Sequence, residues 1–299
     1  MGTIKHNLVI DTLLKSHADY AAHMSKGTPP VLAHLLNTYS DYLFHSYQSH
    51  KTQWASEFKD DFSILLGGDK LHLSASYREE HVTAWLKWIL EAPPLGDKEK
   101  ATFLSTFFSA LLNSETYKGY PGTTPCSVLL TAPISFRTEI SLDRESRIDL
   151  LIETKTTVIL IENKIGDMSL EKNRRYKKLA DEMWPRKVLI PILVLPLESL
   201  DKFQAAVSKE EAIKTLSAFP PATWEIVLNS LRLAIGVFED NSPIYLLWKA
   251  NVYSFISFVE GNVLGYDLWK IRNILSKKVQ PDCSEISEFA RYRKYRKGD

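Results

Sequence analysis

Three short runs of consecutive apolar residues constrain the fold of this chain more than any other feature. They are LLI at 150–152, VILI at 158–161 and VLIPILVL at 188–195. A strand with one exposed face alternates apolar and polar residues, so uninterrupted apolar runs indicate strands that are covered on both faces. A helical pattern from about Ser169 to Met183 separates the last two runs. The sequence therefore predicts an α/β fold in which helices cover both sides of a sheet.

Helical patterns also flank this region on both sides. Apolar residues recur at helical spacing in four further segments, at 7–65, about 77–90, 99–113 and 203 to about 278. Another strand is predicted within 127–140, after a stretch that is rich in Gly and Pro. The expected division of the chain is a helical N-terminal extension at 1–59, a core at 60–270 and a basic tail at 271–299.

The composition narrows the class of protein. Lys and Arg number 37 against 36 Asp and Glu, so the formal charge of +1 offers no overall attraction to nucleic acid or to anionic lipid. Any basic surface has to be local. The two cysteines, Cys126 and Cys283, lack the spacing of a zinc site or a disulfide framework. The sequence also lacks a signal-peptide core and an apolar run of about 18 residues. These features favour a cytoplasmic protein without a membrane anchor.

Several common catalytic motifs are absent from the sequence. It contains no Walker A loop, no GxGxxG turn after a strand, no GxSxG elbow and no HExxH, which excludes the corresponding ATPases, oxidoreductases, hydrolases and metalloproteases. The eight histidines all lie between His6 and His81, at spacings that do not stack two of them on one helix face within reach of one ion. A histidine metal site is therefore not expected.

The first two apolar runs are predicted to form an antiparallel hairpin, because only a short polar stretch separates them. Paired positions in such a hairpin sum to a constant, so a turn centred on residues 155–156 places Asp149 opposite Glu162. The same sum places Arg147 opposite Lys164. Because side chains alternate along a strand, Glu162 and Lys164 share a face. Two carboxylates and one lysine would then project together from the end of an apolar hairpin.

Such a group of charges suits metal-assisted hydrolysis. Two carboxylates about 4 Å apart repel by roughly 4 kcal/mol at an effective dielectric constant of about 20, and a bound divalent cation reverses that cost. Oxygen ligands favour Mg²⁺ or Mn²⁺ over zinc. The cation polarises a phosphoryl oxygen and lowers the pKa of a bound water, while a neighbouring lysine orients that water. From the spacing alone, surface charges that form weak ion pairs are an equally good interpretation.

The hairpin sequence RIDLLIETKTTVILIENKI resembles the core of the PD-(D/E)xK nuclease superfamily, and Asp149, Glu162 and Lys164 match its motif residue by residue. Three other segments are also similar to that superfamily: the upstream helix YREEHVTAWLKWIL, the pair Arg175-Tyr176, and the helical stretch FPPATWEIVLNSLRLAIGVF with YSFISFVE. The resemblance covers about residues 60 to 262. Two positions depart from the pattern, because Ile148 replaces the proline and Lys172 stands where many relatives carry glutamine.

The resemblance implies a restriction-endonuclease-like α/β core, with a mixed central sheet flanked by helices and with helical additions at both ends. It also implies a nuclease that uses Mg²⁺ or Mn²⁺ to hydrolyse phosphodiester bonds, with DNA as the expected substrate. In this interpretation Asp149 and Glu162 bind the metal and Lys164 orients the attacking water. A place in restriction or anti-phage defence, as a homodimer or with a partner protein, is a further implication of the likeness.

One upstream glutamate is expected to join this site, either as a metal ligand or in support of the ligands. At about 100° per residue, Val82, Leu86 and their apolar neighbours define one face of the helix at 77–90, and Glu79 falls at the edge of that face. Glu80 falls on the wet face, where an acid in the first turn suits the helix dipole. We therefore expect Glu79, rather than Glu80, at the site.

Contacts with nucleic acid are predicted from local basic residues. They are Arg147 in the hairpin, Lys172 and Arg175 after it, and Arg291, Arg293 and Lys294 near the C-terminus. The C-terminal run at 290–299 interleaves two tyrosines with five cations, a composition suited to phosphate contacts and base stacking. A solubilising tail explains the same composition equally well.

Two other functions stay open at this point. A catalytically inactive descendant would bind nucleic acid or a protein partner without cutting, although the intact motif argues against it. An RNase on the same fold would carry the same residues.

Overall fold

The computed structural model describes most of the chain after residue 78. The described residues are His45, Gln53, 79–121, 123, 130, 133–144, 146–165, 170, 172–238, 242–276 and 281–297. The helices expected between residues 7 and 65, and the division of the chain at residue 59, therefore fall almost wholly outside the described residues.

The apolar runs form the middle of a five-stranded mixed sheet, as predicted. The strands are β1 (Ser135–Ser141), β2 (Arg147–Glu153), β3 (Thr157–Asn163), β4 (Val188–Leu195) and β5 (Pro221–Thr223), and they lie in the order β1-β2-β3-β4-β5. The first three pair antiparallel and the last three pair parallel. β5 interrupts the region that was expected to be helical from residue 203. The sequence does not predict this strand, because three residues are too few to show a strand periodicity.

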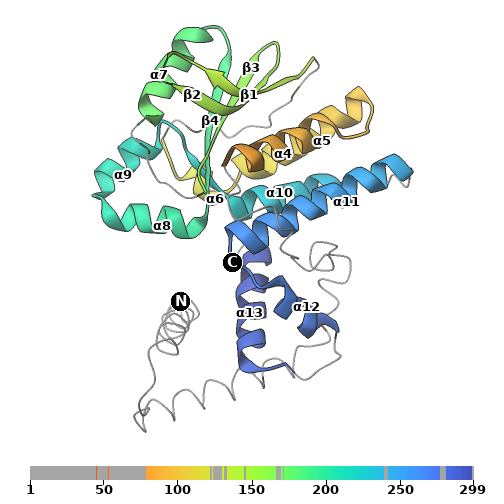
Figure 1. Cartoon of the computed structure of the whole chain (residues 1–299). Coiled ribbons are helices and arrows are strands. Elements are labelled where there is room, and N and C mark those ends of the chain that lie inside the picture. Colours follow the sequence, from red (N-terminus) through yellow and green to blue (C-terminus); the bar gives the residue numbers. More distant parts are fainter. Residues whose placement is uncertain are drawn as a thin grey trace.

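Helices cover both faces of this sheet (Figure 1). One layer contains α4 (Glu79–Glu91), α5 (Asp97–Leu112), α10 (Trp224–Gly236) and α11 (Pro243–Phe258), and the other contains α7 (Asn173–Met183), α8 (Leu197–Ala206) and α9 (Lys209–Leu216). Leu150 and Ile161 pack in the core of the first layer, whereas Leu151 and Leu160 pack in the core of the second. Successive residues of a strand therefore serve opposite cores, which explains why these strands are apolar at every position.

Local capping signals fix several helix ends. The Ser208 side chain accepts a hydrogen bond from the Glu211 amide at the start of α9, and Ser242 accepts one from Tyr245 at the start of α11. Pro243 occupies the first turn of α11, where its missing N–H would have had no partner within the helix. The short helix α6 (Glu115–Lys118) begins in the same way at Ser114.

The C-terminal segment differs from the expected tail. After the π-helix η1 (Val259–Val263), helices α12 (Leu268–Ser276) and α13 (Cys283–Lys297) enclose a third apolar cluster. Tyr292 and Tyr295 are buried in that cluster. The prediction that these tyrosines stack on bases is therefore wrong, because helical periodicity turns them inward while the cations between them face outward or lie at the boundary.

None of the helices that the structure describes combines the length and the apolar character needed to cross a membrane.

Candidate active site

The hairpin formed by β2 and β3 has the predicted register. Leu150 pairs with Ile161 and Glu153 pairs with Val158, so the paired numbers share the sum that places Asp149 opposite Glu162. Next to Leu150 in β2, the side chain of Asp149, rather than a backbone carbonyl, accepts a hydrogen bond from β3. Its Oδ2 accepts a hydrogen bond from the Asn163 amide at 2.7 Å. The carboxylate of Asp149 is thereby held at the end of β3.

Glu162 and Lys164 share a face of β3, as their alternation predicts. The Lys164 ammonium lies 2.9 Å from Glu162 Oε1. The Lys164 amide donates to the Val194 carbonyl at 2.8 Å, so pairing with β4 continues one residue beyond β3 and fixes the backbone of the lysine. These two side chains are therefore positioned by the two central strands of the sheet.

Helix α4 brings Glu79 to the same place, 83 residues before Glu162 in the sequence. Glu79 Oε1 accepts a hydrogen bond from the Ile165 amide at 2.7 Å, and its Oε2 lies 3.9 Å from the Lys164 ammonium. Glu80 is exposed and lies 3.8 Å from Arg147. The geometric prediction that separates the two glutamates is therefore confirmed. Figure 1 shows the start of α4 beside the sheet.

The two hairpin carboxyl groups are held in an environment that disfavours their charge. Only 4% of Glu162 is exposed, and its Oε2 has no hydrogen-bond partner among the described residues. Burial, followed by the charge of Asp149, raises the pKa of Glu162 to about 7, although Lys164 opposes the rise. Burial also raises the pKa of Asp149 to about 6, against the effects of the Asn163 amide and of Lys164.

Lys164 keeps its proton in this environment. Burial by itself lowers the pKa of the lysine, but the neighbouring charge of Glu162, helped by those of Glu79 and Asp149, outweighs burial and raises that pKa overall. The site therefore combines a protonated lysine with two carboxyl groups whose charges are only partly compensated.

Sequence reasoning missed Glu139, which lies in β1 across from Asp149. Thr138 pairs with Leu150 and Ile140 pairs with Ile148, so Glu139 occupies the position between them. Its φ of 57° lies in the left-handed region, which costs about 1–3 kcal/mol for a residue other than glycine. Its Oε2 lies 2.5 Å from Arg147 Nε, and its charge contributes to the raised pKa of Asp149. Neither the strand periodicity nor a sequence motif predicts that a glutamate adopts this conformation beside Asp149.

The donor set fits a hard divalent cation. Asp149 and Glu162 offer carboxylate oxygens, and the buried Oε2 of Glu162 has no hydrogen-bond partner in the described part of the chain. Such a pair suits Mg²⁺ or Mn²⁺, which bind oxygen ligands and keep several waters. No group of three or more His, Cys, Asp or Glu side chains is arranged as metal ligands among the described residues. Glu79 is turned toward the Ile165 amide and Lys164, which favours a supporting role over direct ligation.

The basic residues expected to contact nucleic acid do not gather at one place. Arg175 lies 2.6 Å from Asp143, beyond the end of β1, and Lys172 is exposed just before α7. Arg291 packs over the Tyr266 ring and donates to the Gly265 carbonyl on the C-terminal helices. Figure 1 shows α7 and α13 at opposite ends of the molecule. Arg293 is half-buried on α13 and Lys294 is exposed there. The two groups of cations therefore lie on different parts of the fold.

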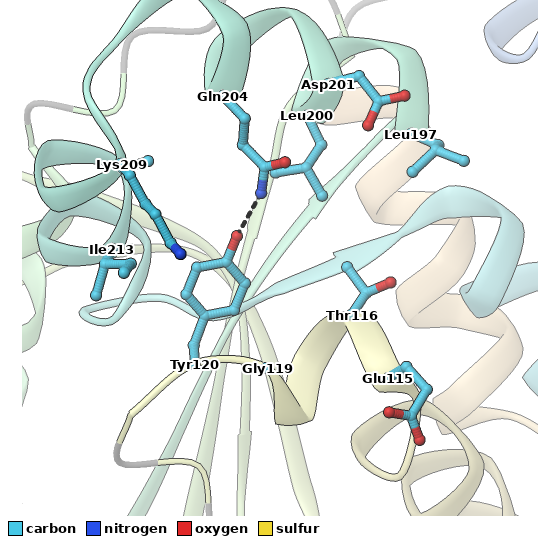
Figure 2. A pocket seen from close by; sticks show the side chains of 11 residues that line it. Glu115, Thr116, Gly119, Tyr120, Leu197, Leu200, Asp201, Gln204, Lys209 and Ile213 are labelled. Atoms are coloured by element: carbon cyan, nitrogen blue, oxygen red, sulfur yellow. Dashed lines mark hydrogen bonds between the residues drawn. The ribbon is translucent and has the colours of Figure 1, made fainter. Parts of the chain in front are cut away.

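A cavity of about 570 Å³ lies apart from these carboxylates, between α6, α8 and α9. Figure 2 shows Tyr120 and Lys209 reaching into it, with Gln204 donating a hydrogen bond to the Tyr120 hydroxyl at 2.7 Å. Its lining contains none of Glu79, Asp149, Glu162 and Lys164.

Comparison with protein families identifies the family of this chain. Neither the curated proteins nor the solved structures contain a match to the chain. Among protein families, the PD-(D/E)XK nuclease superfamily matches residues 72–242, which is more than half of the 299 residues. The matched range includes the carboxylates, the lysine and Glu79, and it ends before η1. The chain therefore belongs to the PD-(D/E)XK nuclease superfamily.

Proposed function

We propose that this chain is a metal-dependent nuclease that hydrolyses phosphodiester bonds in DNA. The observation that carries the proposal lies at the end of the hairpin, where the buried Glu162 and the half-buried Asp149 have raised pKa values beside a protonated lysine. A purely structural site would be more stable without the second carboxylate. A site that binds a cation requires both.

Asp149 and Glu162 are the residues that would hold Mg²⁺ or Mn²⁺. When bound, such an ion supplies a polarised phosphoryl oxygen and a water of lowered pKa. Lys164, protonated and 2.9 Å from Glu162, is placed to donate a hydrogen bond to that water or to the developing charge on phosphate. Glu79 fixes the Ile165 amide and faces the Lys164 ammonium, so it keeps the lysine oriented.

The same proposal favours an active enzyme over an inactive descendant. A protein that only binds nucleic acid has no need for a buried glutamate oxygen without a partner, yet Glu162 is retained together with Asp149 and Lys164. An RNase on this fold would use the same three residues, so the cleavage assay below has to distinguish DNA from RNA as the substrate. A cytoplasmic role in restriction or anti-phage defence, as a homodimer or with a partner protein, stays a prediction from the resemblance.

The test is a cleavage assay on the purified full-length chain. Plasmid, single-stranded DNA and RNA are incubated with Mg²⁺, Mn²⁺ or EDTA, and the expected result is metal-dependent cutting of DNA. Asp149→Asn, Glu162→Gln and Lys164→Ala should each lower the rate at least about 100-fold, in the range that electrostatic groups at catalytic sites contribute. The matched control is Lys177→Ala, which removes a half-exposed lysine paired with Asp181 on α7.

Cleavage that persists in EDTA, or wild-type rates in any two of the three site variants, would overturn the assignment. Cutting of RNA alone would keep the site and change the substrate. Mn²⁺ binding without cleavage of any of the three substrates would favour the inactive descendant.

A further inference from the structure

Asn163 stands between Glu162 and Lys164 in the sequence, but its side chain lies on the opposite face of β3. Only 2% of Asn163 is exposed. Its Nδ2 donates to the Thr83 hydroxyl at 3.1 Å and to the Glu79 carbonyl at 3.4 Å, both in the first turns of α4. Its backbone amide donates to Asp149 Oδ2. One residue therefore connects β2, β3 and the start of α4.

The orientation of this amide is fixed by its partners. A backbone carbonyl can only accept a hydrogen bond, so the NH₂ group of Asn163 has to face Glu79. The other end of the amide, Oδ1, is then buried with no hydrogen-bond partner among the described residues. A buried acceptor without a donor destabilises the folded state, whereas an apolar side chain of similar size would avoid that cost. Stability alone does not explain an asparagine here.

We infer that Asn163 is a positioning residue for the metal site, which acts by fixing the start of α4 so that Glu79 meets its partners. The inference rests on the proposed function, because the position of Glu79 matters only if the site binds a cation. The contact with the Glu79 carbonyl fixes the backbone from which the Glu79 side chain reaches Ile165 and Lys164. The contact with Thr83 fixes the next turn of the same helix.

The test is Asn163→Leu in the full-length chain, with Mn²⁺ binding measured by titration calorimetry. Leucine keeps the backbone amide that holds Asp149 and removes only the side-chain contacts with α4. Glu79 supports the proposed ligand Glu162 through Lys164, and such outer-shell partners typically change metal affinity or activity by 10–100-fold, so we expect Mn²⁺ to bind at least about 10-fold more weakly. The melting temperature of the metal-free protein should change little, because the removal of the buried orphan oxygen offsets the loss of the donor to the Thr83 hydroxyl.

Asn173→Leu is the matched control. Asn173 is also buried and also has an amide atom without a partner in the described structure, but it lies in α7, which packs on the opposite face of the sheet from α4. Its substitution should leave Mn²⁺ affinity within about threefold of wild type. Thr83→Val is a milder change that removes one acceptor of Asn163, and a loss of about 2- to 10-fold is expected from one hydrogen bond.

A double-mutant cycle separates positioning from a general disturbance. With Glu79→Gln already present, the side chain that Asn163 positions has lost its charge, so Asn163→Leu should weaken Mn²⁺ binding by no more than about a further threefold. Equal losses in both backgrounds, or wild-type affinity in Asn163→Leu, would refute the positioning role. If the wild-type protein binds no Mn²⁺, or if binding survives in the Asp149→Asn, Glu162→Gln double variant, the proposed function fails as well. If wild type and Asn163→Leu bind Mn²⁺ equally well, only this inference is refuted.

Discussion

Replacing Asp149 with asparagine tests the electrostatics of the site in the absence of metal. Asparagine has the same shape and can still accept the hydrogen bond that Asp149 receives from the Asn163 amide. It removes one of the two charges that repel each other. We therefore expect Asp149→Asn to stabilise the metal-free protein at pH 8, even though it removes an acidic group of the motif.

The size of the effect follows from the pKa of Asp149, which burial raises from 3.8 to about 6. At about 1.4 kcal/mol for each pKa unit, that difference corresponds to about 3 kcal/mol at a pH above both values. Asp149 is partly accessible to solvent, which screens part of this energy. A gain of about 1–3 kcal/mol in the free energy of unfolding is expected.

The pH dependence gives the sign of the effect. Because the pKa is higher in the folded protein than in the unfolded chain, the folded protein binds this proton more tightly. The contribution of Asp149 to stability is therefore fully present below about pH 4 and is lost as the pH rises through about 6. The advantage of the asparagine variant should be largest at pH 8, and about half as large at pH 5.

The assay is urea denaturation of both proteins in EDTA at pH 5 and pH 8. Asp181→Asn is the matched control, because Asp181 is an exposed acid paired with Lys177, and such pairs contribute about 0–1 kcal/mol. Mg²⁺ at about 100 times its Kd should then stabilise wild type by about 2.7 kcal/mol and leave the variant unchanged. An Asp149→Asn protein that is less stable than wild type at pH 8, or a difference that does not change with pH, would refute the reasoning.

Three further predictions concern other parts of the chain. Glu79→Gln should lower the cleavage rate at least about tenfold, while Glu80→Gln stays within about twofold, because only Glu79 contacts Ile165 and Lys164; equal rates in the two variants would contradict this difference. Glu260→Gln should lower the free energy of unfolding by about 3–5 kcal/mol in urea denaturation, because it breaks the buried ion pair of Glu260 with Arg232, whose closest atoms are 2.7 Å apart. A loss below about 1 kcal/mol would contradict the stabilising role of this ion pair. Deletion of 290–299 should lower the melting temperature and increase binding of a hydrophobic dye, because it removes buried tyrosines of α13; a change in salt-dependent DNA binding with unchanged stability would restore the interpretation as a tail.

The sequence was sufficient to predict the hairpin and its charges. The apolar runs identify β2, β3 and β4, and the bounds expected for β4 agree with those observed. Register followed from the position of the turn, because paired residues in an antiparallel hairpin must sum to a constant. The choice between Glu79 and Glu80 followed from 100° per residue on α4. All three inferences depend on local periodicity, which neighbouring residues determine by themselves.

No local pattern predicts β5, or the burial of Tyr292 and Tyr295 in α13. β5 has three residues and exists only because β4 offers it a backbone edge. Tyr292 and Tyr295 are separated by cations, which made the segment look like a tail, yet the Glu260 carboxylate accepts hydrogen bonds from both hydroxyls. A short strand and a helix with few apolar residues are stabilised by residues that are distant in the sequence. Local sequence patterns therefore cannot predict them.

Local sequence patterns are therefore enough to predict the central strands, the facing pair Asp149 and Glu162, and the side of α4 that meets them. The degree to which those charges are buried, the link from Asn163 to α4, and the positive φ of Glu139 beside Asp149 arise only in the folded protein. The physical reason is that periodicity fixes which face a side chain occupies. Burial, pKa and hydrogen-bond partners depend on elements that are far apart in the chain and meet only when the two helical layers close over the sheet.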